Sequence, residues 1–230
     1  AALGATDLPE LPEGWVWVTL EQLLCFLRNG ISTKPDAESG LPILRISAVR
    51  PMLVKIHDVR YLNSNAEEYT DYALSAGDLL FTRYNGNPDL VGVCGVVPEL
   101  SSKIVHPDKI IRCKLASTLT VHKYVANMAN IGASRSYLAQ RVRTTAGQAG
   151  ISGTDLRGMP IPLSSHKEQL MIIEEIDRRL SVTEELETPL KSTSNAPSVC
   201  VRRSCNRRFR AGYRKGGFQT RPYTKAIYDQ

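Results

Sequence analysis

The sequence lacks the features that mark membrane-spanning, disulfide-stabilised and metal-binding proteins. Its longest apolar run, LVGVCGVV at 90–97, is far shorter than the roughly 20 residues that a membrane-spanning helix requires. Its five cysteines are an odd number without metal-site spacing, and its four histidines are scattered. The N-terminal segment shows neither a basic leader nor an apolar stretch, so we expect no export signal. We therefore predict a cytoplasmic protein with reduced thiols, no metal and no membrane partner.

Signatures of enzymes are missing as well. No Gly-rich loop ends in Gly-Lys-Ser/Thr, and no Ser lies in a Gly-x-Ser-x-Gly pattern. The Asn/Asp-Pro-Pro-aromatic signature of amino-methylating enzymes is approached by NGNPDL at 85–90, which lacks the second proline and the aromatic residue. The sequence therefore predicts a protein that binds, catalyses nothing by itself and needs no cofactor.

Positive charge is concentrated at the C-terminal end of the chain. The net charge is +6, but residues 191–230 carry ten Lys and Arg against one acid, Asp229. The remaining 190 residues are negative overall, at −3. Binding of nucleic acid by this larger part must depend on where its cations are placed, because its bulk charge does not favour DNA.

Short hydrophobic stretches between turn residues predict a strand-rich domain. We expect a linker at 1–13 and a globular domain at 14–164, with Arg45 and Ser47 on one face of its first long strand. Strands are expected at 41–49, 79–83, 90–97 and 110–115. The predicted fold class is α/β in the broad sense, or α+β, with a mixed, twisted sheet and flanking helices.

Three helices are expected, and two of them begin at a capping box. Thr19-Leu-Glu-Gln22 predicts a helix that ends at Gly30, and 124–142 is a second candidate that Gly132 weakens. MPIPL at 159–163 can only be an edge or buried extended segment, because proline cannot donate to a central ladder. Ser165-His-Lys-Glu168 then opens a long amphipathic helix at 165–190. Its narrow apolar seam favours a partner helix: Leu170, Ile173, Ile176, Leu180 and Leu186.

Several stretches, taken in order, resemble one half of a type I restriction–modification specificity subunit. They are LPEGWVWVTLEQL, GLPILRISAV, SAGDLLFTRYNG with LVGVCGVV, and TTAGQAGISGTDLRGMPIPLSSHKEQLMIIEEIDRRLSVTEELE. The last is the most specific, and together they cover roughly residues 11–190. The resemblance implies a target-recognition domain that reads half of a split DNA site, followed by a spacer helix that binds modification subunits.

The resemblance also implies the partners and the role. The chain would recognise double-stranded DNA and direct methyltransferase and restriction subunits to the site, while the chemistry stays with those partners. One reading domain reads only half a split site, so a second domain in a longer parent chain or a second copy would be required. The alternatives are a non-catalytic scaffold and a degenerate, truncated subunit; an autonomous methyltransferase or nuclease is disfavoured by the missing motifs.

Candidate DNA contacts are side chains that suit base edges and phosphates. The loop at 83–87 combines a cation, an aromatic ring and two amides, although its Asn-Gly pair is equally typical of a plain turn. The other candidates lie in a turn-rich loop, beside a strand, on a helix and in the glycine-rich segment, where ordinary surface or turn roles compete. Trp15 and Trp17 are expected to pack rather than stack on bases. The candidates are Lys34, Arg45, Arg50, Arg83, Tyr84, Asn85, Asn87, Ser134, Arg135 and Gln148.

The residues after Leu190 do not continue the helical pattern. They are rich in Cys, Arg and Gly, and back-translation of 195–212 with a one-nucleotide shift permits a spacer-like helical sequence. We therefore favour a frameshifted tail at 191–230 over a natural, disordered basic tail. The chain also begins without Met. A fragment of a longer subunit, a natural half-subunit and a frameshifted product all remain open.

Overall fold

The computed structural model describes residues 8–64, 67–116, 120–145 and 147–193, with side chains described up to residue 181 in the last helix. Residues up to Glu185 belong to one compact unit. A second unit begins at Leu186, and only the continuation of the last helix is described there. The predicted tail lies almost wholly outside the described residues, so the prediction about it remains a prediction.

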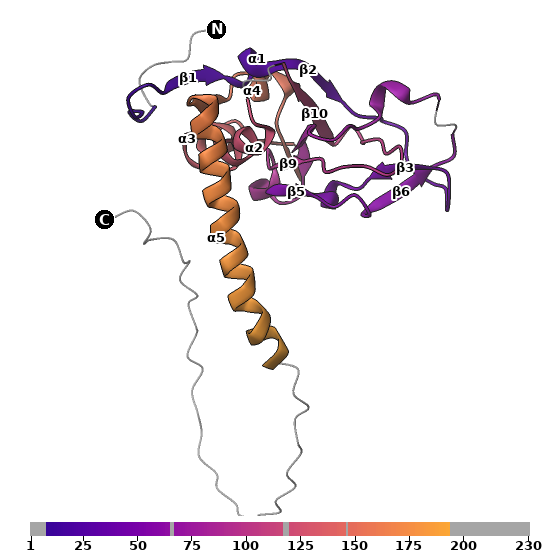
Figure 1. The fold of residues 1–230 in the computed structure, drawn as a ribbon. Coiled ribbons are helices and arrows are strands. Elements are labelled where there is room, and N and C mark those ends of the chain that lie inside the picture. The colour runs from indigo at the N-terminus through magenta and orange to yellow at the C-terminus, as the bar shows by residue number, and fades with distance from the viewer. Residues whose placement is uncertain (1–7, 65–66, 117–119, 146, 194–230) are drawn as a thin grey trace, which may run out of the picture. The chain divides into compact units, whose positions relative to one another are not determined.

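A six-stranded sheet forms the centre of the domain (Figure 1). Neighbouring strands run antiparallel except for one parallel pair, β5 with β9, so the sheet is mixed as predicted. In spatial order the strands are β2 (Leu24–Asn29), β10 (Ile110–Leu115), β7 (Leu79–Thr82), β9 (Cys94–Val96), β5 (Met52–Val54) and β4 (Val49–Arg50).

Three small sheets surround the central one. Two are pairs, β1 (Val16–Thr19) with β13 (Pro160–Leu163) and β3 (Leu41–Leu44) with β6 (Val59–Leu62). The third has three strands in the order β11 (Arg143–Thr145), β12 (Gln148–Gly150) and β8 (Tyr84–Asn85). The MPIPL segment is therefore an extended strand in a two-stranded sheet, as its prolines predicted.

Helices are short apart from the last one. They are α1 (Leu20–Leu23), α2 (His122–Asn130), α3 (Gly132–Ala139), α4 (Gly153–Arg157) and α5 (His166–Thr193), with 3-10 turns at Ile46–Ala48, Thr70–Tyr72 and Pro88–Leu90. Helix α2 packs against β9 and β5 of the central sheet. Among the described residues, no helix combines the length and the apolar character needed to cross a membrane.

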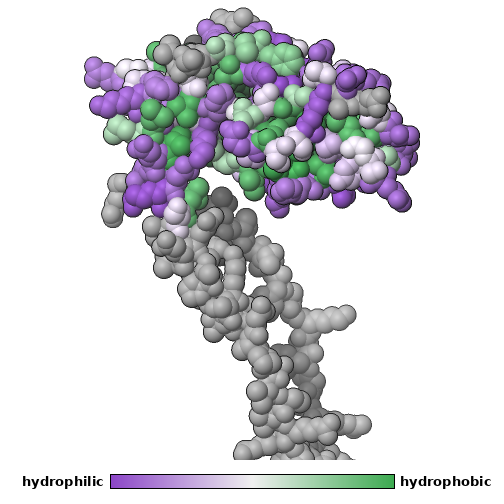
Figure 2. Space-filling view, turned by 45° about the vertical axis from the view of Figure 1, so that its right-hand side comes forward, coloured by the Kyte–Doolittle hydropathy of each residue, from purple (hydrophilic) through white to green (hydrophobic). Residues whose placement is uncertain are grey.

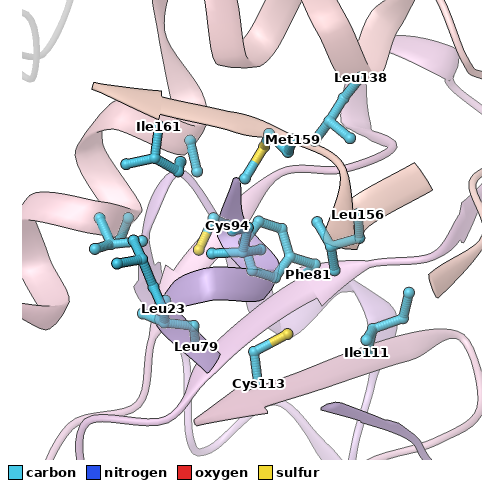
Figure 3. Close-up of a cluster of buried hydrophobic side chains, with 14 of the residues drawn as sticks. Leu23, Leu79, Phe81, Cys94, Ile111, Cys113, Leu138, Leu156, Met159 and Ile161 are labelled. Atoms are coloured by element: carbon cyan, nitrogen blue, oxygen red, sulfur yellow. The ribbon is translucent and has the colours of Figure 1, made fainter. Parts of the chain in front are cut away.

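The main core lies between the central sheet and the helices. Phe81, Ile111, Leu156 and Met159 are fully buried there (Figure 3), and burial of each such side chain contributes about 1.5–3 kcal/mol. Tyr124 is buried as well and its hydroxyl donates to the carbonyl of Pro162 at 2.7 Å. Trp15 and Tyr124 make an edge-to-face contact with 6.5 Å between ring centroids, which confirms a packing role for Trp15.

A buried ion pair joins the central strand β10 to the turn before β7. Arg112 Nε lies 2.7 Å from Asp78 Oδ2, and both side chains are at most 5% exposed. Asp78 also accepts a hydrogen bond from the Ser75 amide at 2.8 Å, which closes the turn predicted at 76–78. Both charges are therefore satisfied inside the fold, and neither is free to bind a ligand.

The predicted helix from Thr19 to Gly30 is wrong beyond its first turn. The capping box forms between Thr19 and Gln22, but the helix ends at Leu23. The following residues form β2, which pairs antiparallel with β10 along its length. A backbone ladder at the sheet edge thus overrides local helix propensity, which is a weak preference of a few tenths of a kcal/mol per residue.

Three other predicted elements are shorter than expected or divided. The strand at 41–49 stops at Leu44 and continues as a 3-10 turn, and the strand at 90–97 is confined to β9. The helix at 124–142 is two helices, because Gly132 adopts a φ of +55° at the break. A positive φ is costly for residues with a Cβ, so the glycine that weakened the prediction marks the joint.

The start of α5 is anchored in the domain. The predicted capping box forms: the Ser165 amide donates to Glu168 Oε2 at 3.1 Å, and the Glu168 amide donates to Ser165 Oγ at 3.3 Å. Gln169 is 1% exposed; its side chain accepts from the Val121 amide and donates to the Ser164 carbonyl, both at 3.0 Å. Ile173 packs into the main core. The helix is thus rooted by one polar and one apolar residue.

Candidate nucleic-acid interface

On the face shown in Figure 2 the surface of the domain is mixed, with hydrophilic side chains around the rim and apolar ones visible between them. Exposed apolar atoms of this kind are normal on a protein surface. Because hydropathy does not distinguish an interface on this face, we identify the candidate interface by clefts that are lined by several cations. Two such clefts contain predicted site residues.

The first cleft has a volume of about 680 Å³ and lies beside the β3–β6 sheet. Its walls are segments 31–35, 44–47 and 107–109 together with Arg60. Three of its side chains are hydroxyls (Ser32, Thr33 and Ser47), and one is an acid (Asp108). Four are cations: Lys34, Arg45, Arg60 and Lys109. A basic cleft that also offers hydroxyl donors suits phosphate groups.

The wall at 44–47 is held by one aspartate. Arg45 Nε lies 3.6 Å from Asp58 Oδ1, and Ser47 Oγ donates to Asp58 Oδ2 at 2.5 Å. Arg45 and Ser47 were expected on one face of a strand. Arg45 instead directly precedes a 3-10 turn and Ser47 lies within it, and both contact Asp58. Arg45 remains half exposed, and an exposed pair of this kind contributes at most about 1 kcal/mol. Arg45 can therefore exchange its partner for a phosphate at little cost.

The floor of the first cleft depends on a close approach of two chain segments. The Ile31 amide donates to the His106 carbonyl and the Asp108 amide donates to the Ile31 carbonyl, both at 2.9 Å. A Cβ on Gly30 would lie only 2.2 Å from the carbonyl oxygens of His106 and Pro107. Glycine is therefore required at position 30.

The second cleft is smaller, about 280 Å³, and is built on the β11–β12–β8 sheet. The register pairs Arg143 with Gly150 and Gly150 with Tyr84. Side chains directly opposite each other in a ladder share a face, so Arg143 and Tyr84 lie on the side of Gly150. All three line the cleft together with Arg83, Gln148, Ile151, Ser152 and Asp155.

A stack of three residues joins the two clefts. The Tyr84 ring lies over Gly150, where a Cβ would come within 2.3 Å of ring atom Cδ1. The Arg83 guanidinium carbon in turn lies 4.7 Å from the Tyr84 ring centroid, within cation–π range. Arg83 Nη1 donates to the Asp108 carbonyl at 3.5 Å, and its amide donates to the Lys109 carbonyl at 2.8 Å. Since Asp108 and Lys109 line the first cleft, Arg83 connects both.

Asp155 supplies the negative charge of the second cleft. It completes a capping box in which its Oδ2 accepts from the Ser152 amide at 2.9 Å and from Ser152 Oγ at 2.6 Å. Partial burial alone would raise the pKa of Asp155, but these hydrogen bonds and the charges of Arg143 and Arg141 hold it below its ordinary value. The carboxylate is therefore ionised at neutral pH and attracts the Arg143 guanidinium.

Two predicted DNA contacts, Ser134 and Arg135, bond to backbone carbonyls of the domain and line neither cleft. Ser134 is 1% exposed, and its hydroxyl donates to the Pro160 carbonyl at 2.5 Å. The Arg135 guanidinium donates to the carbonyls of Val91 at 2.5 Å and Asp89 at 2.6 Å. The hydroxyl and the guanidinium that suggested a groove-binding face instead satisfy buried or half-buried carbonyls of neighbouring segments.

Three more predicted residues stand apart from the clefts. Asn85 Oδ1 accepts from the Asn87 amide at 3.0 Å, and Asn87 Oδ1 accepts from the Asp89 amide at 2.9 Å. These are the turn-closing bonds that asparagine makes with its own backbone, and they support the plain-turn interpretation. Arg50 donates to the Val49 carbonyl on the edge strand β4 and lines neither cleft. Five predicted residues do line a cleft: Lys34, Arg45, Arg83, Tyr84 and Gln148.

Sequence reasoning missed three of the cations. Arg60 comes from β6 and Lys109 lies in the turn before β10, and nothing nearby in the sequence connects them to Lys34 or Arg45. Arg143 lies directly before the glycine-rich segment that was singled out for Gln148. Antiparallel pairing across a tight hairpin would have placed it next to that segment, so this signal was available.

The apolar seam of α5 is divided between the domain and the solvent. Ile173 is buried in the core and Ile176 is partly buried, whereas Leu170 and Leu180 are 44% and 55% exposed. Met171, which the seam did not include, is 58% exposed and borders a shallow apolar hollow with Ile172 and Ile176. Leu186 lies beyond the described side chains.

Comparison with known proteins gives relatives of one kind. The type I restriction enzyme EcoKI specificity subunit of Escherichia coli K12 is 38% identical over 182 residues, which cover 78% of this chain and 38% of that protein. The EcoEI specificity subunit of Escherichia coli is 30% identical over 189 residues, 80% of this chain and 32% of that protein. The chain thus spans roughly a third of the length of these relatives.

A solved structure shares the fold. The HsdS subunit of Thermoanaerobacter tengcongensis superposes with a TM-score of 0.54 at 17% identity, over 84% of this chain and 43% of that one. At this identity the similarity concerns the fold, and it agrees with the predicted mixed α+β class. No protein-family model matches the chain. Over the four fifths of its length that the curated relatives cover, the chain belongs to the family of type I restriction enzyme specificity subunits.

Proposed function

We propose that this chain recognises a specific sequence in double-stranded DNA as part of a type I specificity subunit. It acts without catalysis and directs methyltransferase and restriction subunits to their target. Membership of the family supports this function, because the relatives are specificity subunits of restriction enzymes.

One observation carries the proposal. Six cations meet at two adjoining clefts, although the first 190 residues are negative overall. The link between the clefts is Arg83, which lines one and bonds to the backbone of the other. Such local concentration against the bulk charge is what steers a protein surface to DNA. The six are Lys34, Arg45, Arg60, Arg83, Lys109 and Arg143.

The remaining partners follow from the domain organisation that the sequence predicts. A single recognition domain reads half of a split site, so the functional complex contains a second domain or a second copy. Helix α5 presents Leu170, Met171 and Leu180 to solvent, and these side chains are available for a partner helix or a modification subunit. Base flipping and methyl transfer belong to that partner.

The proposal is tested by mapping adenine methylation in cells. The chain is co-expressed with the modification subunit of its own genome, both as it stands and with the reading frame restored after Lys191. We expect one split motif to be methylated throughout the genome. Arg83→Ala should abolish the motif, whereas Lys55→Ala, an exposed cation outside both clefts, should leave it unchanged.

The outcomes separate recognition from the rival functions. Methylation only after the reading frame is restored would show that the recognition domain is functional and that the tail prevents methylation. Co-purification with the modification subunit without any methylated motif would favour a scaffold. Absence of both association and methylation in either frame would refute recognition and leave a degenerate product.

A further inference from the structure

The β11–β12 hairpin differs from the first cleft in what it exposes. It is a short antiparallel ribbon with Arg143 near its base and Gln148 near its tip, and both side chains are exposed. Its other face is anchored, because Ala149 is 1% exposed and belongs to the main core. The ribbon therefore presents one guanidinium and one amide from a fixed backbone.

The register places these two side chains on the same face. Arg143 is opposite Gly150, and Gln148 is two residues before Gly150 on the same strand. Residues two apart in a strand share a face, and the cleft independently contains both Arg143 and Gln148. Diagonal neighbours in a ladder lie about 7–8 Å apart. That separation corresponds to roughly two base-pair steps along DNA, at about 3.4 Å per step.

The chemistry of the pair suits base edges. β8 pairs only with Ala149 and Gly150, so the hairpin is two-stranded from Gln148 to its tip. A two-stranded ribbon fits the major groove, where Arg binds the O6 and N7 atoms of guanine and Gln binds the N6 and N7 atoms of adenine. The first cleft offers four cations and three hydroxyls but no amide side chain. Cations with hydroxyl neighbours fix position on the phosphate backbone without carrying sequence information.

We propose that Arg143 and Gln148 are specificity-determining residues that read a guanine and an adenine about two base pairs apart, whereas Arg60 and Lys109 hold phosphates. This division of roles rests on the proposed function, since it assigns parts of the same DNA-binding surface. Tyr84 of β8 pairs with Gly150 of the ribbon, and the ionised Asp155 carboxylate attracts the Arg143 guanidinium.

The test combines sequence selection with salt dependence. The full chain, co-expressed with its modification subunit, selects from a library of random duplexes, and the bound DNA is sequenced. Arg143→Ala should reduce the preference at one guanine about 5- to 150-fold, and Gln148→Ala should do the same at one adenine. Arg60→Ala should weaken all sequences equally, leave the motif intact and lower the slope of log affinity against log salt by about 0.9.

Two conservative variants sharpen the result. Arg143→Lys keeps the charge but not the planar fork, so it should weaken the guanine preference while keeping most of the salt slope. Gln148→Glu replaces a donor and acceptor by an acceptor alone, so it should change the preferred base from adenine to cytosine, whose N4 amine donates. Neither effect follows from a residue that merely supports the fold.

The negative outcomes are distinct. If the unaltered chain selects no motif, the proposed function fails, and the division of roles fails with it. If it selects a motif that Arg143→Ala and Gln148→Ala leave unchanged, only the base-reading role is overturned. If Arg60→Ala alters the motif, the assignment of phosphate contacts to the first cleft is overturned. Equal unfolding midpoints for all variants exclude a general loss of structure.

Discussion

Replacing Gly150 by Ala tests whether the Gly150–Tyr84–Arg83 stack holds the centre of the interface. The added methyl carbon would lie 2.3 Å from Tyr84 Cδ1, 2.6 Å from Cε1 and 3.2 Å from the Arg83 carbonyl oxygen. Carbon atoms in contact lie about 3.5–4.0 Å apart, so the ring must move by at least about 1 Å. Overpacking of this size costs about 1–3 kcal/mol of stability.

The displaced ring also moves the Arg83 guanidinium, which lies 4.7 Å from its centroid. A misplaced charged hydrogen bond is worth about 1.5 kcal/mol or more, so affinity for the selected duplex should fall about tenfold. Fluorescence anisotropy measures this affinity, and urea unfolding measures the stability. Gly86→Ala is the matched control, because a Cβ there meets nothing within 4 Å and its φ is not positive.

A double-mutant cycle separates the ring from other causes. In a Tyr84→Ala background the Gly150→Ala substitution should cost much less stability, because both ring atoms that the methyl group meets are gone and only the Arg83 carbonyl oxygen, at 3.2 Å, remains. The role of the Gly150–Tyr84–Arg83 stack would be refuted if Gly150→Ala bound DNA as tightly as Gly86→Ala. It would also fail if the cost of Gly150→Ala were the same with and without the tyrosine ring.

Three further predictions concern residues that stabilise the domain. Ser134→Ala leaves the buried Pro160 carbonyl without its hydroxyl donor, so urea unfolding should show a loss of about 1–3 kcal/mol while the DNA motif is unchanged; a changed motif would reinstate Ser134 as a contact. Arg112→Leu removes the nearer of the two cations that pair with Asp78 and leaves only Lys114 Nζ, at 3.9 Å from Asp78 Oδ1, so it should cost up to about 3–5 kcal/mol, and a loss below about 1 kcal/mol would contradict the burial. Burial above all, with the charges of Arg112 and Arg28 adding to it, lowers the pKa of His106 to about 4, against hydrogen bonds that act to raise it. The unfolded chain therefore takes up a proton first, and stability should be complete above about pH 6.5 and fall by about 3 kcal/mol as the pH drops to 4. A His106→Gln variant with the same pH dependence as the unaltered chain would exclude that origin.

Short-range sequence signals correctly predicted the elements that depend on contacts or dihedral angles within a few residues. The Ser165–Glu168 capping box, the turn at 76–78 and the proline-rich strand β13 all form where they were expected. Each depends on bonds or dihedral angles within a few residues. The helix expected up to Gly30 failed because its second half pairs with β10, more than 80 residues further along the chain. A partner at that distance leaves no trace in the local pattern.

The sequence predicted what types of residue form the candidate site, but not all of the residues that the fold brings together there. Arg83, Tyr84 and Gln148 were found because each lies in a glycine-containing segment that looked like a loop. Arg60 and Lys109 reach the first cleft through the β3–β6 pair and the segment after His106, and only the folded chain brings them together. Ser134 bonds to Pro160 of β13 and Arg135 bonds to Val91 and Asp89, and the sequence alone does not show these contacts of α3 with distant segments.

The anchoring of the first turns of α5 in the domain determines how the helix moves when the domain rotates. Gln169 and Ile173 fix the first turns of the helix in the domain, so a rotation of the domain on DNA must turn the helix with it. From Gln169 to Glu185 the helix is about 24 Å long at 1.5 Å per residue. A tilt of about 10° at the root therefore displaces Glu185 by about 4 Å, which is comparable to one base-pair step. If the domain binds DNA as proposed, a change in its orientation on the site would therefore change the direction of the helix by a distance that a subunit in contact with the helix could detect.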